Sequence, residues 1–231
     1  MLCAGWGVFE RVRAAGRRAQ APAEKRAEKR AEKRAENAGA IVGYRVRAAP
    51  VTARAAAADP FPARTESMSQ DFSTCDLCDA HKNDSEGDFR VLPPVFASFG
   101  GRARFAGAVA TVKCHEDNTL VKAALDTPGQ GRVLVVDGGA SLRRALVGGN
   151  LAAAAARNGW AGIVVDGAVR DAGELAAAAV GIRALALMPL PTEKRNQGQA
   201  EVAVTLQGVR VRPGEWLYAD EDGIVVMSKP A

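Results

Sequence analysis

The sequence predicts a layered α/β fold with a mixed β-sheet for residues 68–231. Apolar strands alternate with short helices between about residues 107 and 188, a pattern typical of parallel strands joined by helices. A run of short strands with glycine-containing turns follows, which indicates an antiparallel part. The chain has 231 residues, enough for one or two domains, and 48% are hydrophobic, so part of it can bury a core.

Each element of the alternating part has a local signal. Ser73 can cap a helix that ends near Lys82, because a serine hydroxyl accepts hydrogen bonds from the first helical turn. Gly159 closes an alanine-rich helix, since glycine commonly follows helix ends. Helices are predicted over residues 118–125, 151–158 and 171–178. Strands are predicted over residues 107–113, 133–137, 162–165 and 182–188, and Gly138-Gly139 and Asp166-Gly167 end the two middle ones.

The end of the chain is predicted to form four short strands, over residues 202–206, 209–212, 216–219 and 224–227. Asp222-Gly223 marks a tight turn between the last two strands. We interpret Asp220, Glu221 and Asp222 as the solvated part of that turn rather than as a metal cluster. The polar segment 192–199 either covers a functional site or forms an ordinary surface loop.

Residues 1–67 differ from the rest in charge. They hold 14 of the 31 Lys and Arg residues and 7 of the 26 Asp and Glu residues, a net charge of +7. The other residues hold 17 basic and 19 acidic side chains, a net charge of −2. The basic character therefore belongs to the N-terminal third and gives no argument for nucleic-acid binding by the rest.

Three interpretations of residues 1–67 compete. One is a basic tail that contacts nucleic acid or a membrane. A second is an organelle transit peptide, but such peptides are rich in serine and poor in acids, whereas the first serine here is Ser67. We favour the third, a disordered basic extension rich in Ala and Arg, or a start site assigned too far upstream of Met68. The repeat Ala-Glu-Lys-Arg over residues 23–36 has no apolar stripe with which a helix docks on a core.

Several functional classes lack their sequence signals. No apolar run approaches the roughly 18 residues of a membrane-spanning helix. There is no Gly-x-x-x-x-Gly-Lys phosphate loop and no Gly-x-Gly-x-x-Gly after a strand. His81 and His115 are the only histidines and are too far apart for a local zinc motif. Four cysteines in a chain of this length do not form a disulfide scaffold, so we expect a cytoplasmic, reducing location.

The Cys75-x-x-Cys78 motif has a simple interpretation. A four-cysteine zinc site needs a second pair, and Cys3 and Cys114 are single and distant. A thioredoxin-type pair follows a strand, whereas this pair lies in a predicted helix. We therefore predict that both cysteines are small core residues on one helical face.

The most specific chemical signal lies between residues 135 and 174. The residues Gly148, Gly149, Asn150 and Leu151 open a helix, and backbone N–H groups at a helix start bind carboxylates. Arg170 can hold a carboxylate or enolate oxygen with its planar fork. Asp171 can bind a hard divalent cation, and Glu174 reaches the same side one turn later. The alternative is an arginine paired with its neighbours at an acidic helix start.

Five collinear segments resemble the regulator of ribonuclease activity A (RraA) family, which includes metal-dependent 4-hydroxy-4-methyl-2-oxoglutarate aldolases. The resemblance covers residues 72–228 and none of residues 1–67. It implies a layered β/β/α fold of the swivelling-domain type. The segments are Phe99-Gly100-Gly101-Arg102 and residues 132–139, 142–146, 162–171 and 217–223.

The resemblance also implies roles for single residues. Aldolase-like members keep a glycine, twenty residues, Arg-Asp, two residues and an acid, which matches Gly149, Arg170-Asp171 and Glu174. The helix start from Gly148 to Leu151 would bind substrate, Arg170 would bind substrate and stabilise the enolate, and Asp171 would bind the metal. Glu174 would be a supporting acid. Members known as ribonuclease E inhibitors tend to lose the acid after the arginine.

The chemistry implied is retro-aldol cleavage of 4-hydroxy-4-methyl-2-oxoglutarate to two pyruvates with Mg²⁺ or Mn²⁺. Decarboxylation of oxaloacetate would pass through the same enolate. Candidates for the proton acceptor are a metal-bound water, Glu174 and Asp166. The resemblance further implies a homotrimer. The alternative function is a non-catalytic inhibitor that binds ribonuclease E; we expect no membrane partner, and no nucleic-acid partner for residues 68–231.

Overall fold

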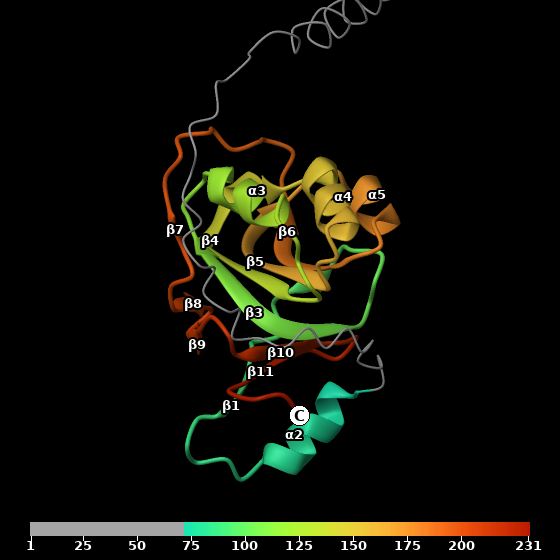
Figure 1. The fold of residues 1–231 in the computed structure, drawn as a ribbon, viewed down its shortest axis with the longest axis vertical. Coiled ribbons are helices and arrows are strands. Elements are labelled where there is room, and N and C mark those ends of the chain that lie inside the picture. Colours follow the sequence, from blue (N-terminus) through green and yellow to red (C-terminus); the bar gives the residue numbers. More distant parts are fainter. Residues whose placement is uncertain (1–71) are drawn as a thin grey trace, which may run out of the picture. The chain divides into compact units, whose positions relative to one another are not determined.

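The computed structural model describes residues 72–231, so the predictions for residues 1–67 lie outside the described part (Figure 1). A nine-stranded sheet has the order β1-β11-β10-β3-β4-β5-β6-β2, with β7 also paired to β3, and β8 and β9 form a separate hairpin. The strands are β1 (Phe89–Val91), β2 (Ala97–Ser98), β3 (Phe105–Lys113), β4 (Val133–Val147), β5 (Gly162–Val169), β6 (Gly181–Leu187), β7 (Gln199–Ala200), β8 (Val204–Leu206), β9 (Val209–Val211), β10 (Trp216–Ala219) and β11 (Ile224–Met227). The helices are α2 (Thr74–His81), α3 (Thr119–Leu125), α4 (Gly149–Arg157) and α5 (Ala172–Ala177).

The sheet is mixed, as the sequence predicts. Strands β3, β4, β5 and β6 are parallel, with Val109 opposite Val133 and Leu134 opposite Ile163. The strands β10, β11 and β1 extend this core antiparallel on one side, and β2 pairs antiparallel with β6 on the other. Helices connect the parallel strands because successive parallel strands need a crossover.

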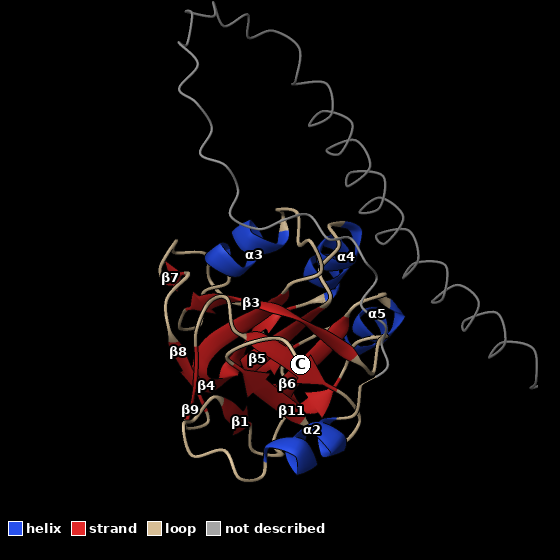
Figure 2. Ribbon diagram, turned by 60° about the horizontal axis from the view of Figure 1, so that its bottom comes forward, coloured by secondary structure: helices blue, strands red, loops and turns tan. Residues whose placement is uncertain are grey.

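Three hydrophobic clusters show how the layers stack. Leu134, Ile163 and Ile182 face a cluster that includes the apolar side chains of α3, α4 and α5. Val135 and Val164 point to the opposite face, where they pack with β10, β11 and the β8–β9 hairpin. Helix α2 covers the other side of β10 and β11. Figure 2 shows α2 on one side of the strands and the other three helices across them. The predicted β/β/α layering is confirmed, with α2 as an additional outer element.

Most predicted elements are confirmed to within two residues. Ser73 caps α2, and its hydroxyl accepts a hydrogen bond from the backbone N–H of Asp76 at 3.3 Å. Helix α4 begins at Gly149, two residues before the predicted start, because the Gly148 carbonyl already accepts from Leu151 and Ala152. The four predicted C-terminal strands are present.

The predicted ends of the two middle strands were wrong. Strand β4 continues ten residues beyond Asp137, and β5 continues three residues beyond Asp166. Asp137 lies opposite Asp166, and three register shifts follow before Val147 pairs with Val169. Residues 138–146 therefore form an excursion of β4, in which only Ser141 and Ala145 have registered partners in β5. Gly138 permits this excursion, since a Cβ there would lie 2.6 Å from the Asp166 carbonyl oxygen.

The prediction of a solvated turn was wrong for Asp220. Its side chain is only 1% exposed and accepts hydrogen bonds from the backbone N–H and hydroxyl of Thr74 (2.7 and 2.6 Å). The backbone N–H groups of Asp222 and Gly223 also donate to it, so the β10–β11 turn anchors the start of α2. Burial opposes ionisation of Asp220, but these donors outweigh it and lower the pKa of the carboxyl.

The cysteine prediction was half right. Cys78 is half-buried and packs against the cluster beneath α2, whereas Cys75 is exposed. Cys114 is buried, and burial, followed by the nearby charge of Asp117, raises the pKa of its thiol to about 12.

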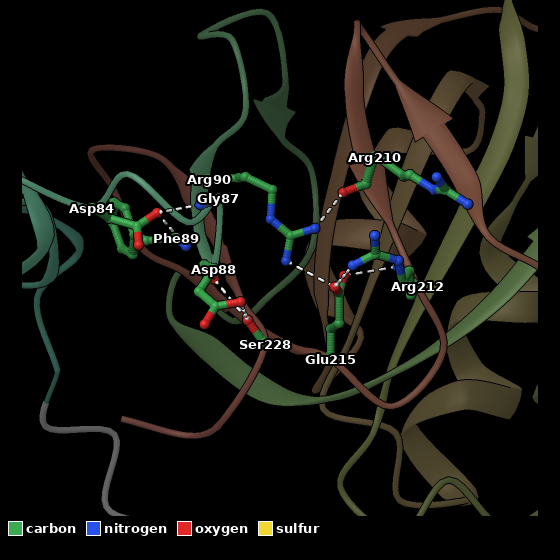
Figure 3. Close-up of polar contacts among 9 residues, drawn as sticks. All are labelled: Asp84, Gly87, Asp88, Phe89, Arg90, Arg210, Arg212, Glu215 and Ser228. Carbon is green, nitrogen blue, oxygen red and sulfur yellow. Dashed lines mark hydrogen bonds and ion pairs between the residues drawn. The ribbon is translucent and has the colours of Figure 1, made fainter.

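Strand β1 is a short edge strand, missed by the sequence analysis together with β2 and β7 because two or three residues show no alternation. Its Arg90 reaches across to the β9–β10 turn (Figure 3). The guanidinium donates to the Arg210 carbonyl at 2.8 Å and lies 2.9 Å from Oε1 of Glu215, close enough for an ion pair but without hydrogen-bond alignment. Glu215 is 6% exposed and also accepts from the Arg212 backbone at 2.8 Å. These contacts fasten the edge strand to the rest of the sheet.

Candidate active site

The candidate site lies where β4 and β5 end side by side. Val147 is opposite Val169 in the last registered pair of these strands, and the backbone N–H of Arg170 donates to the Val147 carbonyl at 2.9 Å. Gly148 and Arg170 therefore leave the sheet as neighbours, although 22 positions separate them in the sequence. Ligands of open α/β sheets bind at such carboxyl ends of strands.

Gly148 and Gly149 are in direct contact with charged side chains. A Cβ at Gly148 would lie 2.7 Å from Oδ2 of Asp171 and 3.1 Å from Nε of Arg170. A Cβ at Gly149 would overlap the carboxylate of Glu174. A side chain at either position would therefore displace one of these charged side chains, most severely at Gly149, where Cβ of Glu174 would also lie only 2.6 Å away. The spacing Gly149, Arg170-Asp171 and Glu174 thus corresponds to a spatial cluster.

Asp171 is held in an unusual backbone conformation. It precedes α5 with φ of 64° and ψ of 49°, in the left-handed region that aspartate tolerates better than most residues. Its carbonyl accepts from Glu174 and Leu175, and its Oδ2 accepts from the backbone N–H of Gly149 at 3.1 Å. Strained conformations of this kind collect at functional sites.

Arg170 and Asp171 form an ion pair, with Nε 3.4 Å from Oδ2. Their side chains are 37% and 38% exposed, so both remain accessible to a ligand. The alternative interpretation from the sequence, in which Arg170 pairs with its neighbour, is therefore partly correct. Partial exposure means that this pair contributes little to stability.

The four residues of the helix start differ in what they offer. The N–H groups of Gly149 and Leu151 are engaged, the first by Asp171 and the second by the Gly148 carbonyl at 3.0 Å. The Leu151 side chain is 8% exposed and belongs to the core. Asn150 is exposed on the first turn, where a backbone N–H has no helical acceptor.

Asp171 fits a cation that keeps most of its water ligands. Both contacts of its carboxylate involve Oδ2. Within residues 72–231 there is no group of three or more His, Cys, Asp or Glu side chains able to hold a metal ion. Mg²⁺ is commonly bound through one or two carboxylates, several waters and substrate oxygens, so a single aspartate beside a partly exposed arginine fits it.

Asp166, a candidate for the proton acceptor, lies along β5 before the strand end, and its carboxylate is bound by Gln207. It precedes Arg170 by four positions, about 13 Å along a strand. Gln207 from the β8–β9 turn donates to its Oδ1 at 2.7 Å. Burial and then the charge of Asp137 raise the pKa of Asp166, while Gln207 lowers it in part.

The segment 192–199 is bound to Asp117, which the sequence analysis did not single out. Oδ2 of Asp117 accepts from the backbone N–H groups of Arg195 and Gln197 at 2.8 and 3.0 Å. Arg144 also binds Glu193 at 3.1 Å. These contacts hold the segment beside the β4 excursion, and within the segment only Gln199 belongs to a strand, β7. No single residue type in the sequence signals this anchor.

A family model and several known proteins are similar to this chain. The RraA-like family model, described as Aldolase/RraA, matches residues 74–226. A protein of Albidiferax ferrireducens named "Putative 4-hydroxy-4-methyl-2-oxoglutarate aldolase" is 66% identical over 167 residues, 69% of this chain and 96% of that protein. A protein of the same name from Burkholderia multivorans is 60% identical over 156 residues, 67% of this chain and 95% of that protein.

A solved structure is similar as well. The RNA-processing inhibitor RraA from Thermus thermophilis is 49% identical, with a TM-score of 0.66, over 69% of this chain and 94% of that one. Among the helices of residues 72–231, none has the length and apolar character needed to cross a bilayer. The matched family model spans nearly all of the described residues, and the chain belongs to the RraA-like family.

Proposed function

We propose that this protein is an aldolase that cleaves 4-hydroxy-4-methyl-2-oxoglutarate into two molecules of pyruvate with a divalent metal ion. The observation that supports the proposal is the contact of Gly148 and Gly149 with Arg170, Asp171 and Glu174 at one strand end. The names of relatives at 60% and 66% identity agree with the same reaction.

Arg170 and the helix start would bind the anionic groups of the substrate. Asn150 offers a backbone N–H at the positive end of α4, which suits a carboxylate. The guanidinium of Arg170 would hold the oxygen on which negative charge grows as the C3–C4 bond breaks. The electron pair of that bond passes into a pyruvate enolate, and the C4 fragment becomes the first pyruvate.

Two proton transfers complete the reaction. The C4 hydroxyl loses its proton as the bond breaks, and the enolate takes a proton at C3 to give the second pyruvate. Glu174 is the nearest exposed carboxylate on the α5 side of the glycine pair, and we assign it as the acid–base candidate. Its carboxylate lies against Gly149, beside the helix start.

Asp171 would hold the metal ion, for which Mg²⁺ or Mn²⁺ suits a carboxylate donor. When bound, such an ion polarises a keto group and lowers the energy of negative charge on its oxygen. Arg170 would act on the same charge. Oxaloacetate is also a 2-oxo acid that yields a pyruvate enolate on losing carbon dioxide, so we propose decarboxylation as a secondary activity.

The decisive experiment measures pyruvate release from both substrates with added Mg²⁺, with added Mn²⁺ and with a chelator. We expect release with metal and a loss of activity with the chelator. If neither substrate releases pyruvate under any metal condition, the proposal is overturned.

A second candidate is a regulator that binds ribonuclease E without catalysis. It is favoured by the 49% identity to a protein named as an RNA-processing inhibitor. Binding of the purified protein to ribonuclease E, together with inactivity toward both 2-oxo acids, would favour this alternative.

We also propose that the protein is a homotrimer, as the family resemblance implies. Leu142, Leu187 and Leu190 are large apolar residues that are 49%, 51% and 47% exposed. Leu187 ends β6, and the Leu190 carbonyl accepts from Ala145 near the end of β4. Contact between copies would cover these side chains. Light scattering that gives a stable, active monomer would exclude the trimer.

A further inference from the structure

Three consecutive polar residues between β3 and α3 bind three different segments. Glu116 accepts from the Ser141 hydroxyl at 2.8 Å in the β4 excursion. Asp117 accepts from two backbone N–H groups of the segment 192–199. Asn118 donates from Nδ2 to the Leu146 carbonyl at 3.0 Å, near the end of β4. The residues 116–118 therefore act as one junction beside the last residues of β4.

Charged and polar side chains make ion pairs and hydrogen bonds around this junction. Glu116 is 6% exposed, has φ of 53°, and lies 3.3 Å from Nε of Arg143. The Ser141 hydrogen bond, followed by the positive side chains around it, lowers the pKa of Glu116 against the opposing effect of burial. Asp117 also accepts from the backbone and hydroxyl of Thr119 at 2.8 and 2.6 Å, which fixes the start of α3.

The Asn118 contact lies two residues from the candidate site. Leu146 is followed by Val147, whose carbonyl accepts from the backbone N–H of Arg170, and then by Gly148 and Gly149. A shift of Leu146 therefore moves the glycine pair relative to Arg170 and Asp171. The two glycines have no side chains with which to pack, so their position depends on the segments to either side and on the hydrogen bond from Gly149 to Asp171.

A contribution to the stability of the fold does not by itself explain the presence of asparagine at position 118. Its Oδ1 is buried without a hydrogen-bond partner among residues 72–231, and leaving a buried acceptor unpaired is unfavourable. The favourable bond to Leu146 is thus offset in part. Its side chain also makes no capping bond to α3, although Asn118 occupies the cap position.

We infer that Asn118 is a positioning residue, which fixes the end of β4 so that the backbone of residues 148–151 is held in the geometry that binds the substrate carboxylate. This inference rests on the proposed aldolase function. Asn118 acts through Leu146 rather than by touching the substrate.

Asn158 provides a matched control at the end of α4, the helix that begins with the glycine pair. It follows α4, and its Nδ2 donates to the Leu125 carbonyl at 2.7 Å, in a partly buried contact like that of Asn118. Asn118→Ala and Asn158→Ala remove the same kind of hydrogen bond. Only the first of these bonds lies beside the glycine pair.

The experiment compares steady-state kinetics and amide hydrogen exchange of the two variants in the full-length protein. For Asn118→Ala we expect KM for the aldol substrate to rise roughly tenfold to a hundredfold, with a smaller change in kcat, because misplacement of binding groups is costly. Exchange of the amides of residues 148–151 should become about tenfold faster. Asn158→Ala should leave KM within about twofold of the wild-type value.

Equal KM and equal exchange at residues 148–151 in Asn118→Ala and the wild type would overturn the inference. So would the same shift in Asn158→Ala. If Asn118→Ala does not fold, Asn118→Asp repeats the test with the same shape and without the donor. If the wild-type protein releases no pyruvate, the proposed function fails, while the exchange measurement still tests the positioning role.

Discussion

The backbone N–H of Gly149 donates to Oδ2 of Asp171 across 3.1 Å, which ties the start of α4 to the start of α5. The carboxylate that we assign to the metal is therefore oriented by the same glycine pair that we assign to the substrate. Nε of Arg170 lies 3.4 Å from the same oxygen. A ligand that bridges the metal and the helix start would use groups already held in one geometry.

Gly149→Ala should abolish most activity. The new Cβ would overlap Glu174, which must move, and the Asp171 hydrogen bond would be disturbed. A misplacement of about 1 Å can cost roughly a hundredfold in rate. Gly173→Ala is the control, because no atom lies within 4 Å of a Cβ there. Comparable pyruvate release by both variants would contradict the close packing of this site.

The lowered pKa of Asp117 predicts that the stability of the fold depends on pH. Burial opposes its ionisation, but the hydrogen bonds from Thr119, Gln197 and Arg195 outweigh burial and lower its pKa to about 2. An unfolded aspartate titrates near pH 3.9, so the carboxylate stabilises the fold above about pH 4, and this contribution is lost as the pH falls from about 4 to 2.

Asp117→Asn should therefore lower the free energy of unfolding at pH 7 by on the order of 2 kcal/mol, with a smaller deficit at pH 3. Chemical denaturation at the two pH values measures this difference. Asp126→Asn, which removes an exposed carboxylate paired with Lys122, should have little effect at either pH. A deficit that does not shrink at pH 3 would contradict the role assigned to Asp117.

A protein that begins at Met68 should fold and retain full activity. The family model matches residues 74–226, and residues 72–231 contain three hydrophobic clusters of buried side chains. Thermal unfolding and pyruvate release of this shortened protein should match those of the full chain. A loss of solubility or a tenfold loss of activity would show that residues 1–67 are needed.

The periodic part of the fold could be predicted from the sequence, and the pairing details could not. Apolar runs and Ser73 identified the strands and the first helix because they depend on local patterns. The continuation of β5 to Val169 depends on pairing with β4, whose register shifts after Asp137. Asp220 was interpreted as solvated because its buried partner, Thr74, is 146 positions away and cannot be identified from the local sequence.

The candidate site, like the fold, could be predicted only in part from the sequence. The spacing from Gly149 to Glu174 was visible in the sequence, and the structure brings these residues into contact. The contributions of Asn118 and Asp117 were not visible. Their partners are backbone atoms of distant segments, and a backbone carbonyl or N–H carries no mark in the sequence.

Arg170→Lys should be severe although the charge is kept. An ammonium group is a point charge and does not reproduce the planar fork that holds two oxygens. We expect kcat/KM for both substrates to fall by about a hundredfold, in the range found when a group that stabilises developing charge is removed. Arg157→Lys, an exposed substitution in the last turn of α4, should leave kcat/KM unchanged. Near-normal turnover by Arg170→Lys would remove this residue from the mechanism.

Asp171→Asn tests the metal site most directly. The substitution keeps the size of the side chain and removes the charge that we assign to the cation. Metal assistance supplies several kcal/mol of stabilisation to a developing enolate, and each 1.4 kcal/mol or so is a factor of ten in rate. Pyruvate release should therefore fall by roughly a hundredfold or more, and excess Mg²⁺ or Mn²⁺ should restore part of it.

The fold of Asp171→Asn should survive, because a helix-start acid contributes only about 0.3–1 kcal/mol. Asp76→Asn is the control, since it removes an exposed acid from the first turn of α2. Wild-type rates of Asp171→Asn on both substrates without metal would show that Asp171 binds no catalytic cation.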